Sequence, residues 1–323
     1  MENSNDTSSI NALFVGVGAL GSVYAWRLQN SGKVDVTAVC RSNYQAVVDN
    51  GFQIKSTLYG THTYRPSKVV RSVAEATDSY DYIVVCTKAL PNLGDNSDMI
   101  ASAVGKDTAI IVIQNGIGIE DPFAKRYPDN PVISVVAYID ASQPTSGVIE
   151  HGSSSGLVMT AHPGVEQLVQ LWNENGVRCM ATEQIQAFRW LKLAWNASFN
   201  PISVVSGDVD TQKMLEDAGC RKLIRDVMVE VYRLGEAVVG NKLPAFMGID
   251  GPDAYIGYTD RPGTTVYPSM LMDFRAKRPM EHAVILGRPI EIARELGVPV
   301  PHMETVYALL LMVEKQNTKQ AVK

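Results

Sequence analysis

Cysteine and histidine are scarce in this sequence, and neither is spaced for metal or redox chemistry. The chain has 323 residues, with four cysteines and five histidines. No C-x-x-C motif occurs, and the cysteines stand far apart at Cys40, Cys86, Cys179 and Cys220, so we expect buried free thiols. The histidines are equally dispersed, at His62, His151, His162, His282 and His302. This spacing argues against a metal centre.

Long apolar runs and an excess of positive charge are also missing. No apolar stretch reaches the roughly 20 residues that cross a bilayer, and the polar opening MENSNDTSS lacks the apolar centre of a signal peptide. The formal net charge is -5, and the basic residues form no run. We therefore expect a cytosolic address, a loose N-terminal tail, and neither a membrane nor a nucleic acid as partner.

The first half of the chain alternates short β-branched runs with segments of helical length. The runs are Ala12–Val15, Asp35–Cys40, Tyr82–Cys86, Ala109–Ile113 and Val132–Tyr138. This alternation predicts βαβ units and an α/β fold with a doubly wound parallel sheet of the Rossmann type. The Gly- and Ser-rich stretch from Asp140 to Met159 predicts turns that join a few antiparallel strands at the sheet edge.

The second half has a helical pattern. We expect helices at Ile185–Phe199, Gln212–Val239, Arg288–Glu295 and Glu304–Lys315. Because the chain is longer than one core usually organises, we predict two domains, 1–182 around the sheet and 183–323 mostly helical. Between the helices, Gly248–Pro268 is rich in Gly and Pro, and so long a loop is typical of a lid or binding loop.

A glycine motif follows the first predicted strand directly. Gly16, Gly18 and Gly21 form G-x-G-x-x-G before a helix expected to begin near Ser22. The first glycine allows a tight turn, the second lets the backbone approach a pyrophosphate, and the third lets the helix pack on the strand. Gly-rich turns also serve purely structural connections, but the strand, the helix and the N-terminal position together favour a dinucleotide site.

The end of the second strand bears on the choice of dinucleotide. NAD-specific folds place an acid there to bind the ribose 2'-hydroxyl, whereas this chain has Arg41 followed by Ser42. A guanidinium and a hydroxyl can bind a 2'-phosphate, so NADP(H) is the expected cofactor, unless Arg41 is only a solvated charge. Lys88 and Asn115 emerge from two further apolar strands at the edge where such sheets contact ligands.

A polar stripe crosses the first helix of the second half. Lys192, Asn196 and Asn200 recur at every fourth position of an otherwise apolar segment, which places them on one helix face. They either satisfy buried polar groups or line a cavity. We favour a cavity, because a buried lysine without a partner is costly.

With these residues in view, the sequence resembles the ketopantoate reductase family. The resemblance spans nearly the whole chain in the family's order and rests on six pieces: GVGALG, CTKA, QNGIG, KLAWNASFNP, the spacing from SMLMD to Glu281, and ELGVPVPHMETVYALL. It implies that the protein reduces 2-ketopantoate to pantoate with NADPH, as an enzyme of pantothenate biosynthesis. A homodimer is also expected.

The resemblance assigns roles to residues of this chain. Lys192 matches the catalytic lysine, and Glu281 matches the glutamate that works with it, although Glu281 taken alone would be interpreted as a carboxylate on a helix surface. The expected substrate contacts are Asn196, Asn200 and Ser269, and the residues expected near the nicotinamide and the reacting carbonyl are Lys88 and Asn115. Chemistry agrees, because an ammonium group can protonate the oxygen of a ketone that receives a hydride.

Two departures from the family pattern affect the expected substrate. Val266 stands where the family usually has an Asn for the substrate's distal polar group, and Met280-Glu281-His282-Ala283 replaces the common Thr-Glu-Ile-Asp. The valine favours a more apolar 2-keto acid or a specialised metabolite as the alternative substrate. An alternative of another class is an NADP-sensing protein without turnover, which would have no use for Lys192 and Glu281.

Overall fold

The computed structural model describes residues 9–261 and 265–321. The predicted N-terminal tail therefore lies almost wholly outside the described residues, as do residues 262–264 of the predicted loop. The chain divides into two compact units. The first comprises residues up to Lys88, Asp95–Gln114 and Glu120–Ile185. The second comprises Ala89–Gly94, Asn115–Ile119 and everything from Gln186 onward, so two short segments of the predicted sheet domain, one of them with Asn115, cluster with the helices.

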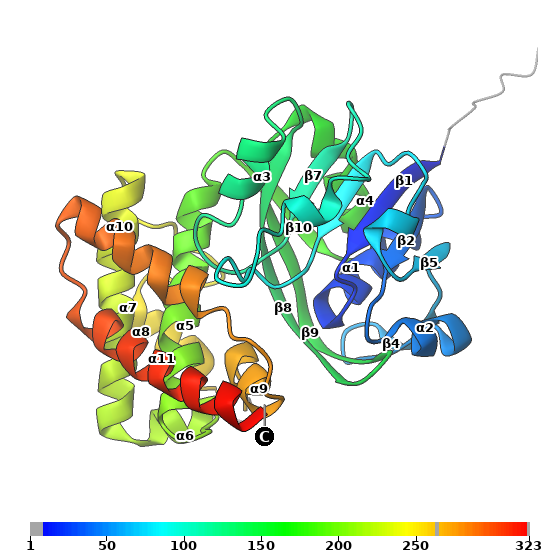
Figure 1. Ribbon diagram of the computed structural model, residues 1–323. Coiled ribbons are helices and arrows are strands. Elements are labelled where there is room, and N and C mark those ends of the chain that lie inside the picture. Colours follow the sequence, from blue (N-terminus) through cyan, green and yellow to red (C-terminus); the bar gives the residue numbers. More distant parts are fainter. Residues whose placement is uncertain (1–8, 262–264, 322–323) are drawn as a thin grey trace, which may run out of the picture. The chain divides into compact units, whose positions relative to one another are not determined.

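A mixed sheet forms the centre of the first unit (Figure 1). Its parallel part has the order β5-β2-β1-β6-β7-β8 and contains β1 (Ile10–Val15), β2 (Val34–Val39), β5 (Lys68–Val70), β6 (Tyr82–Val85), β7 (Ala109–Val112) and β8 (Val132–Thr145). The strands β6 and β7 are buried at every position, as expected of parallel strands covered on both faces. The predicted α/β class and the five predicted strands are confirmed.

The sheet continues past β8 through strands that the sequence revealed less well. The antiparallel pair expected after Asp140 is formed by β8 and β9 (Val148–Thr160), which are longer than predicted. Beyond β9 lie β3 (Phe52–Ser56) and β4 (Gly60–Tyr64), and β10 (Arg178–Thr182) also pairs with β9. The prediction missed all four of these strands, β3, β4, β5 and β10. All are short, at five residues or fewer, and β4 and β10 are also largely exposed.

Helices and short turns complete this unit. They are α1 (Ala19–Gln29), α2 (Tyr44–Asn50), α3 (Asp121–Arg126) and α4 (Glu166–Glu174), with 3-10 turns at Val73–Glu75, Asp98–Ile100 and Pro163–Val165. Helix α1 begins three residues before the predicted start. It is fixed by Trp172 of α4, whose indole N–H donates to the carbonyl of Tyr24 at 3.1 Å, while the Tyr24 hydroxyl donates to Gly156 of β9. These bonds attach the helix that follows the glycine motif to the sheet.

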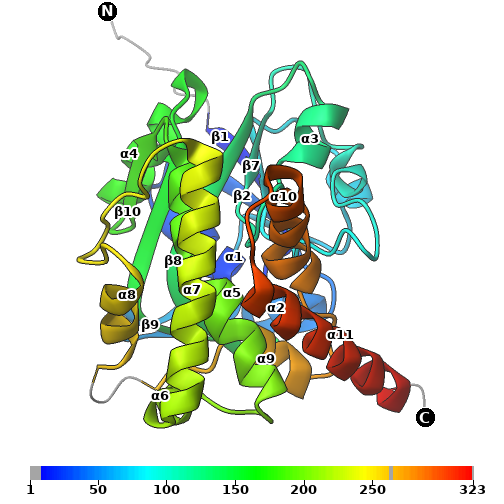
Figure 2. The same ribbon diagram turned by 90° about the vertical axis from the view of Figure 1, so that its left-hand side faces the viewer.

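The second unit is helical (Figure 2). Its elements are α5 (Ile185–Val205), α6 (Thr211–Glu216), α7 (Ala218–Val239), α8 (Pro252–Thr259), α9 (Ser269–Arg275), a π-helical turn (Ala283–Gly287), α10 (Arg288–Leu296) and α11 (Pro301–Ala321). The single helix predicted over Gln212–Val239 is wrong, because Asp217 leaves helical geometry and its carboxylate caps α7 at the Cys220 amide. The expected long loop Gly248–Pro268 contains α8.

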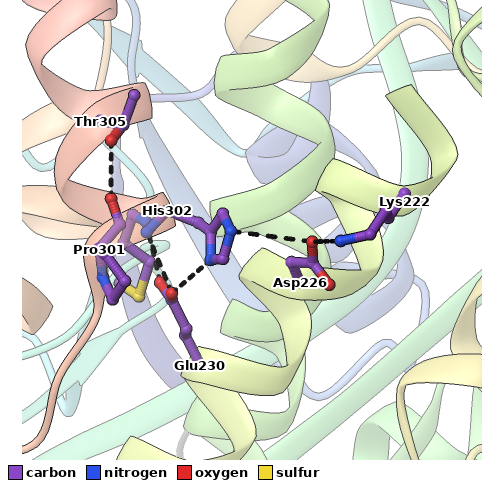
Figure 3. A network of polar contacts seen from close by, with 7 residues as sticks. Lys222, Asp226, Glu230, Pro301, His302 and Thr305 are labelled. Atoms are coloured by element: carbon purple, nitrogen blue, oxygen red, sulfur yellow. Dashed lines mark hydrogen bonds and ion pairs between the residues drawn. The ribbon is translucent and has the colours of Figure 1, made fainter. Parts of the chain in front are cut away.

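Helix α11 begins on a buried carboxylate of α7 (Figure 3). Glu230 is 2 % exposed and accepts hydrogen bonds from the backbone amides of His302 and Met303 and from Nδ1 of His302 at 2.6 Å. The other ring nitrogen of His302 lies 3.7 Å from Asp226, which pairs with Lys222. A carboxylate at a helix N-terminus satisfies amides that have no partner within the helix, so Glu230 fixes the start of α11 on α7.

The structure bears on two expectations from the sequence, which concern membrane-spanning segments and the burial of the cysteines. Among the described residues, no helix combines the length and the hydropathy that a bilayer-spanning segment requires. All four cysteines are free, but only Cys40 and Cys179 are buried, whereas Cys86 and Cys220 are partly exposed. Burial raises the pKa of the Cys40 thiol to about 12, which makes it a poor nucleophile.

Candidate active site

The glycine motif is shaped by the protein at two positions and left open at the third. Gly16 has φ +87°, and a Cβ there would lie 2.7 Å from Thr87. A Cβ on Gly21 would lie 3.0 Å from the carbonyl oxygen of Gly16. At Gly18, in contrast, no atom of the other described residues lies within 4 Å of a Cβ position, apart from its chain neighbours and its own helix. Packing therefore requires the outer glycines, while the middle glycine keeps space free.

The N-terminus of α1 has no side-chain cap. Gly18 is the N-cap and provides no side-chain hydrogen bond, and the first turn of the helix contains no acidic residue. Its first amides and the positive end of the helix dipole are thus suited to a phosphate. Together with the open space at Gly18, this fits the pyrophosphate of a dinucleotide.

Three polar residues stand near the ends of β2 and β5. Arg41 and Ser42 follow β2 and are exposed, as a residue that binds a soluble phosphate must be. Arg71, which the sequence analysis did not single out, follows β5 directly, and β5 pairs in parallel with β2. Its guanidinium lies 4.0 Å from the centre of the Tyr44 ring. The register Val39↔Val70 could have revealed Arg71, had β5 been recognised as a strand.

Lys88 follows the end of β6 and is the last residue of the first segment of the first unit. It is partly buried, and its carbonyl accepts a hydrogen bond from the Asn96 side chain at 2.7 Å. Gln114, two residues beyond β7, donates to the carbonyl of Thr87 at 2.7 Å. The ends of β6 and β7 are therefore tied to each other.

In the second unit, an asparagine joins the lysine and the glutamate singled out from the sequence. Nζ of Lys192 on α5 donates to Oδ1 of Asn115 at 3.0 Å, and Nδ2 of Asn196, one turn later, reaches the same oxygen at 3.5 Å. The amide nitrogen of Asn115 in turn donates to Oε2 of Glu281 at 3.5 Å. Four residues from three distant segments thus form one network.

Glu281 is not a helix-surface carboxylate. It is 7 % exposed and lies two residues before the π-helical turn Ala283–Gly287. Its Oε1 accepts a hydrogen bond from the backbone amide of Ala89 at 3.0 Å, a contact that no sequence motif indicated. Both oxygens of the carboxylate are therefore directed by hydrogen bonds, which compensates for part of the cost of burying its charge.

The turn that carries Asn115 is held by close packing. Gly116 has φ +98°, and a Cβ there would lie 2.5 Å from Val284. The carbonyl of Gly116 accepts a hydrogen bond from Arg189 at 3.1 Å, and the amide of Ile117 donates to the carbonyl of Val284. Arg189 is buried on α5. The sequence analysis missed it, because a lone arginine gives no sign that its side chain is buried.

Electrostatics prepare Lys192 to give up a proton. Burial and, to a smaller extent, the nearby charge of Arg189 lower the pKa of its ammonium group, Glu281 opposes both effects, and the resulting pKa is about 8. An amine with a pKa near neutrality can be protonated before a reaction and deprotonated after it. The network can therefore deliver a proton.

Comparison with known proteins identifies the family of this chain. The family profile described as "Ketopantoate reductase PanE/ApbA" matches residues 12–164, and its C-terminal counterpart matches residues 184–314. The chain belongs to the ketopantoate reductase family. This is a family of oxidoreductases that act on a ketone or CH–OH group.

Individual relatives match along almost the whole chain. The crystal structure of a 2-dehydropantoate 2-reductase from Methylococcus capsulatus is 36% identical, covers 96% of this chain and 98% of that one, and superposes with a TM-score of 0.84. A 2-dehydropantoate 2-reductase from Nostoc is 28% identical over 94% of this chain and 95% of its own. The meiotically up-regulated gene 72 protein of Schizosaccharomyces pombe is 29% identical, and this chain spans only 58% of its length.

The remaining residues expected from the ketopantoate reductase resemblance lie in the second unit without joining the network. Asn200 is fully buried on α5, and neither atom of its amide makes a hydrogen bond within the described residues. Ser269 is exposed at the start of α9. Val266 is partly buried, and its amide and carbonyl are both bonded to Thr211, which leaves only an apolar side chain to offer a ligand.

Proposed function

We propose that this chain reduces a small 2-keto acid to the 2-hydroxy acid with NADPH, with 2-dehydropantoate as the reference substrate. The observation that carries the proposal is the partly buried network of Lys192, Asn115 and Glu281. When bound, the reduced nicotinamide supplies a hydride to the keto carbon. The residues of this chain bind, orient and protonate.

Lys192 is the proposed general acid. Negative charge develops on the carbonyl oxygen as the ketone is reduced, and a positioned ammonium group stabilises this charge and then transfers a proton to it. Asn115 fixes the direction of Nζ, and Glu281 keeps the pKa of Lys192 from falling further, so the amine holds its proton near neutral pH. A catalytic pKa of about 8 is close to a working pH.

Asn196, Asn200 and Ser269 are proposed to hold the substrate. A buried amide without hydrogen bonds, such as that of Asn200, is costly unless a ligand completes it. The carboxylate or hydroxyl groups of a keto acid would satisfy it. Binding by several fixed polar groups would present one face of the ketone to the cofactor.

NADPH is proposed in preference to NADH. Arg41 and Ser42 offer a guanidinium and a hydroxyl at the end of β2, and Arg71 adds a second guanidinium at the end of the neighbouring strand. A 2'-phosphate accepts charge-assisted hydrogen bonds from such groups. Lys88 is proposed as a further contact with the cofactor.

Oxidation of NADPH in the presence of a panel of 2-keto acids tests the proposal. Consumption that depends on one of the acids supports it. A competing possibility is an NADP sensor, which would bind NADPH tightly and oxidise it with none of the acids. The lysine network favours the enzyme, because a sensor gains nothing from an amine whose pKa lies near neutrality.

A more apolar substrate is the second candidate, and Val266 favours it. A site with valine gains nothing from the distal hydroxyl of ketopantoate and still removes water from it, at a cost of about 1 to 3 kcal/mol if the hydroxyl stays unpaired. We expect kcat/KM for 2-ketoisovalerate to equal or exceed that for ketopantoate, and Val266→Asn to shift the ratio toward ketopantoate. A preference of the unmodified enzyme for ketopantoate of roughly a hundredfold would refute this use of Val266.

A further inference from the structure

A carboxylate on the last helix contacts both neighbours of Glu281. Glu314 lies on α11, and its Oε1 accepts a hydrogen bond from the backbone amide of Met280 at 3.2 Å. Its Oε2 lies 2.6 Å from Nε2 of His282. One side chain therefore holds the residue before Glu281 and the residue after it.

These contacts join two buried residues to a partly buried carboxylate. Met280 is 1 % exposed, His282 is 5 % exposed, and the side chain of Glu314 is 18 % exposed. Burial alone would raise the pKa of the Glu314 carboxyl, but the hydrogen bond and charge of His282 and the Met280 amide hold it below its usual value. A partly buried contact of this kind is less screened by water than an exposed one, so it helps to hold the local geometry.

The backbone after Glu281 is constrained as well. The carbonyl of Glu281 accepts a hydrogen bond from Ile285 as the chain enters the π-helical turn Ala283–Gly287. The ring of His282 packs against Tyr307 of α11, with 5.8 Å between ring centres. Helix α11 also contacts the π-helical turn itself. The backbone around Glu281 is thus held by α11, and its carboxylate is left to point at Ala89 and Asn115.

We propose that Glu314 is a positioning residue for Glu281, and that it sets the proton affinity of Lys192 through Glu281 and Asn115. Glu314 touches neither substrate nor cofactor in this assignment. His282 is the partner of Glu314 in this contact. The proposal rests on the proposed function only for its catalytic consequence, because the protonation of Lys192 can be measured without any substrate.

The test is the pKa of Lys192, measured by competitive acetylation with acetic anhydride across a pH series and quantified by mass spectrometry of the peptide that contains it. The unmodified chain, Glu281→Gln, Glu314→Gln and the double variant are compared. Glu281→Gln removes the charge that raises the pKa and should lower it by about 1 unit. Glu314→Gln should lower it in the same direction by about half as much, and the double variant no more than Glu281→Gln alone.

Glu230→Gln is the matched control, because Glu230 anchors the other end of α11 without contacting the Glu281 segment. It should leave the pKa of Lys192 unchanged. If Glu314→Gln does not fold, His282→Gln removes the same ion pair while leaving Glu314 bonded to the Met280 amide. A shift caused by Glu314→Gln or His282→Gln but not by Glu230→Gln supports the proposal.

Two results would overturn it. One is an unchanged pKa in Glu314→Gln alongside a lowered pKa in Glu281→Gln, and the other is an equal shift in Glu230→Gln. Failure of the proposed function would be a separate result, in which the unmodified chain oxidises NADPH with none of the 2-keto acids. The positioning role of Glu314 would still be decided by the acetylation series.

Discussion

The glycine loop of the first unit and the lysine network of the second unit are built in opposite ways. The loop uses the six consecutive residues 16–21, and its middle glycine, Gly18, leaves space where a side chain would stand. The network uses side chains from segments about 80 residues or more apart in sequence, joined by hydrogen bonds to Asn115. A backbone site is therefore encoded by neighbouring residues, whereas an acid–base site depends on the packing of distant segments.

The largest expected effect comes from removing the proton donor of the network. Lys192→Ala should lower kcat by about 10² to 10⁴ and leave NADPH affinity nearly unchanged. Binding by fluorescence titration and turnover by absorbance separate the two effects. Lys222→Ala, which removes an exposed amine paired with Asp226, is the control and should change neither. Near-normal turnover of Lys192→Ala would require a different donor, with Lys88 the next to test.

Two glycine variants should separate folding from binding within the loop. Gly16→Ala forces a Cβ into Thr87 at a positive φ and should lower the free energy of unfolding by about 1 to 3 kcal/mol. Gly18→Ala meets none of the other described residues within 4 Å beyond its own helix and neighbours, so it should cost little stability. It should weaken NADPH binding tenfold or more, which is about 1.4 kcal/mol. Urea denaturation and fluorescence titration measure the two quantities. Equal stability losses in both variants would contradict the assignment of Gly18 to the cofactor.

The cofactor preference should depend on Arg41. NADPH is expected to bind at least about tenfold more tightly than NADH, or about 1.4 kcal/mol, and Arg41→Ala should remove most of that difference. Arg71→Ala should reduce it further if both guanidinium groups reach the 2'-phosphate. Titration of each variant with both cofactors measures the effect. Equal affinities in the unmodified protein would refute the NADPH assignment.

The same contrast explains how much could be predicted from the sequence. The alternation of apolar runs predicted the Rossmann-type sheet, and local glycine spacing predicted the loop, because both depend on neighbours in sequence. Lys192 and Asn196 share a helix face, so their proximity also followed from spacing. The Ala89 amide, the buried Arg189 and the Glu314 contact could not be predicted, because each depends on which distant segments pack together. Strands such as β4 were missed for a similar reason, since pairing with β3 rather than apolar pattern stabilises it.

The pH dependence of kcat/KM for ketone reduction is the most direct test of Lys192 as the proton donor. If Lys192 is the acid, the rate should fall as pH rises through about 8, because only the protonated amine can donate. Glu281→Gln should move this fall to lower pH by about 1 unit, and Arg189→Gln, which removes a positive charge, should move it to higher pH. If the rate stays constant well above pH 8, or falls at the same pH in all three proteins, Lys192 is not the acid that this pH dependence reports.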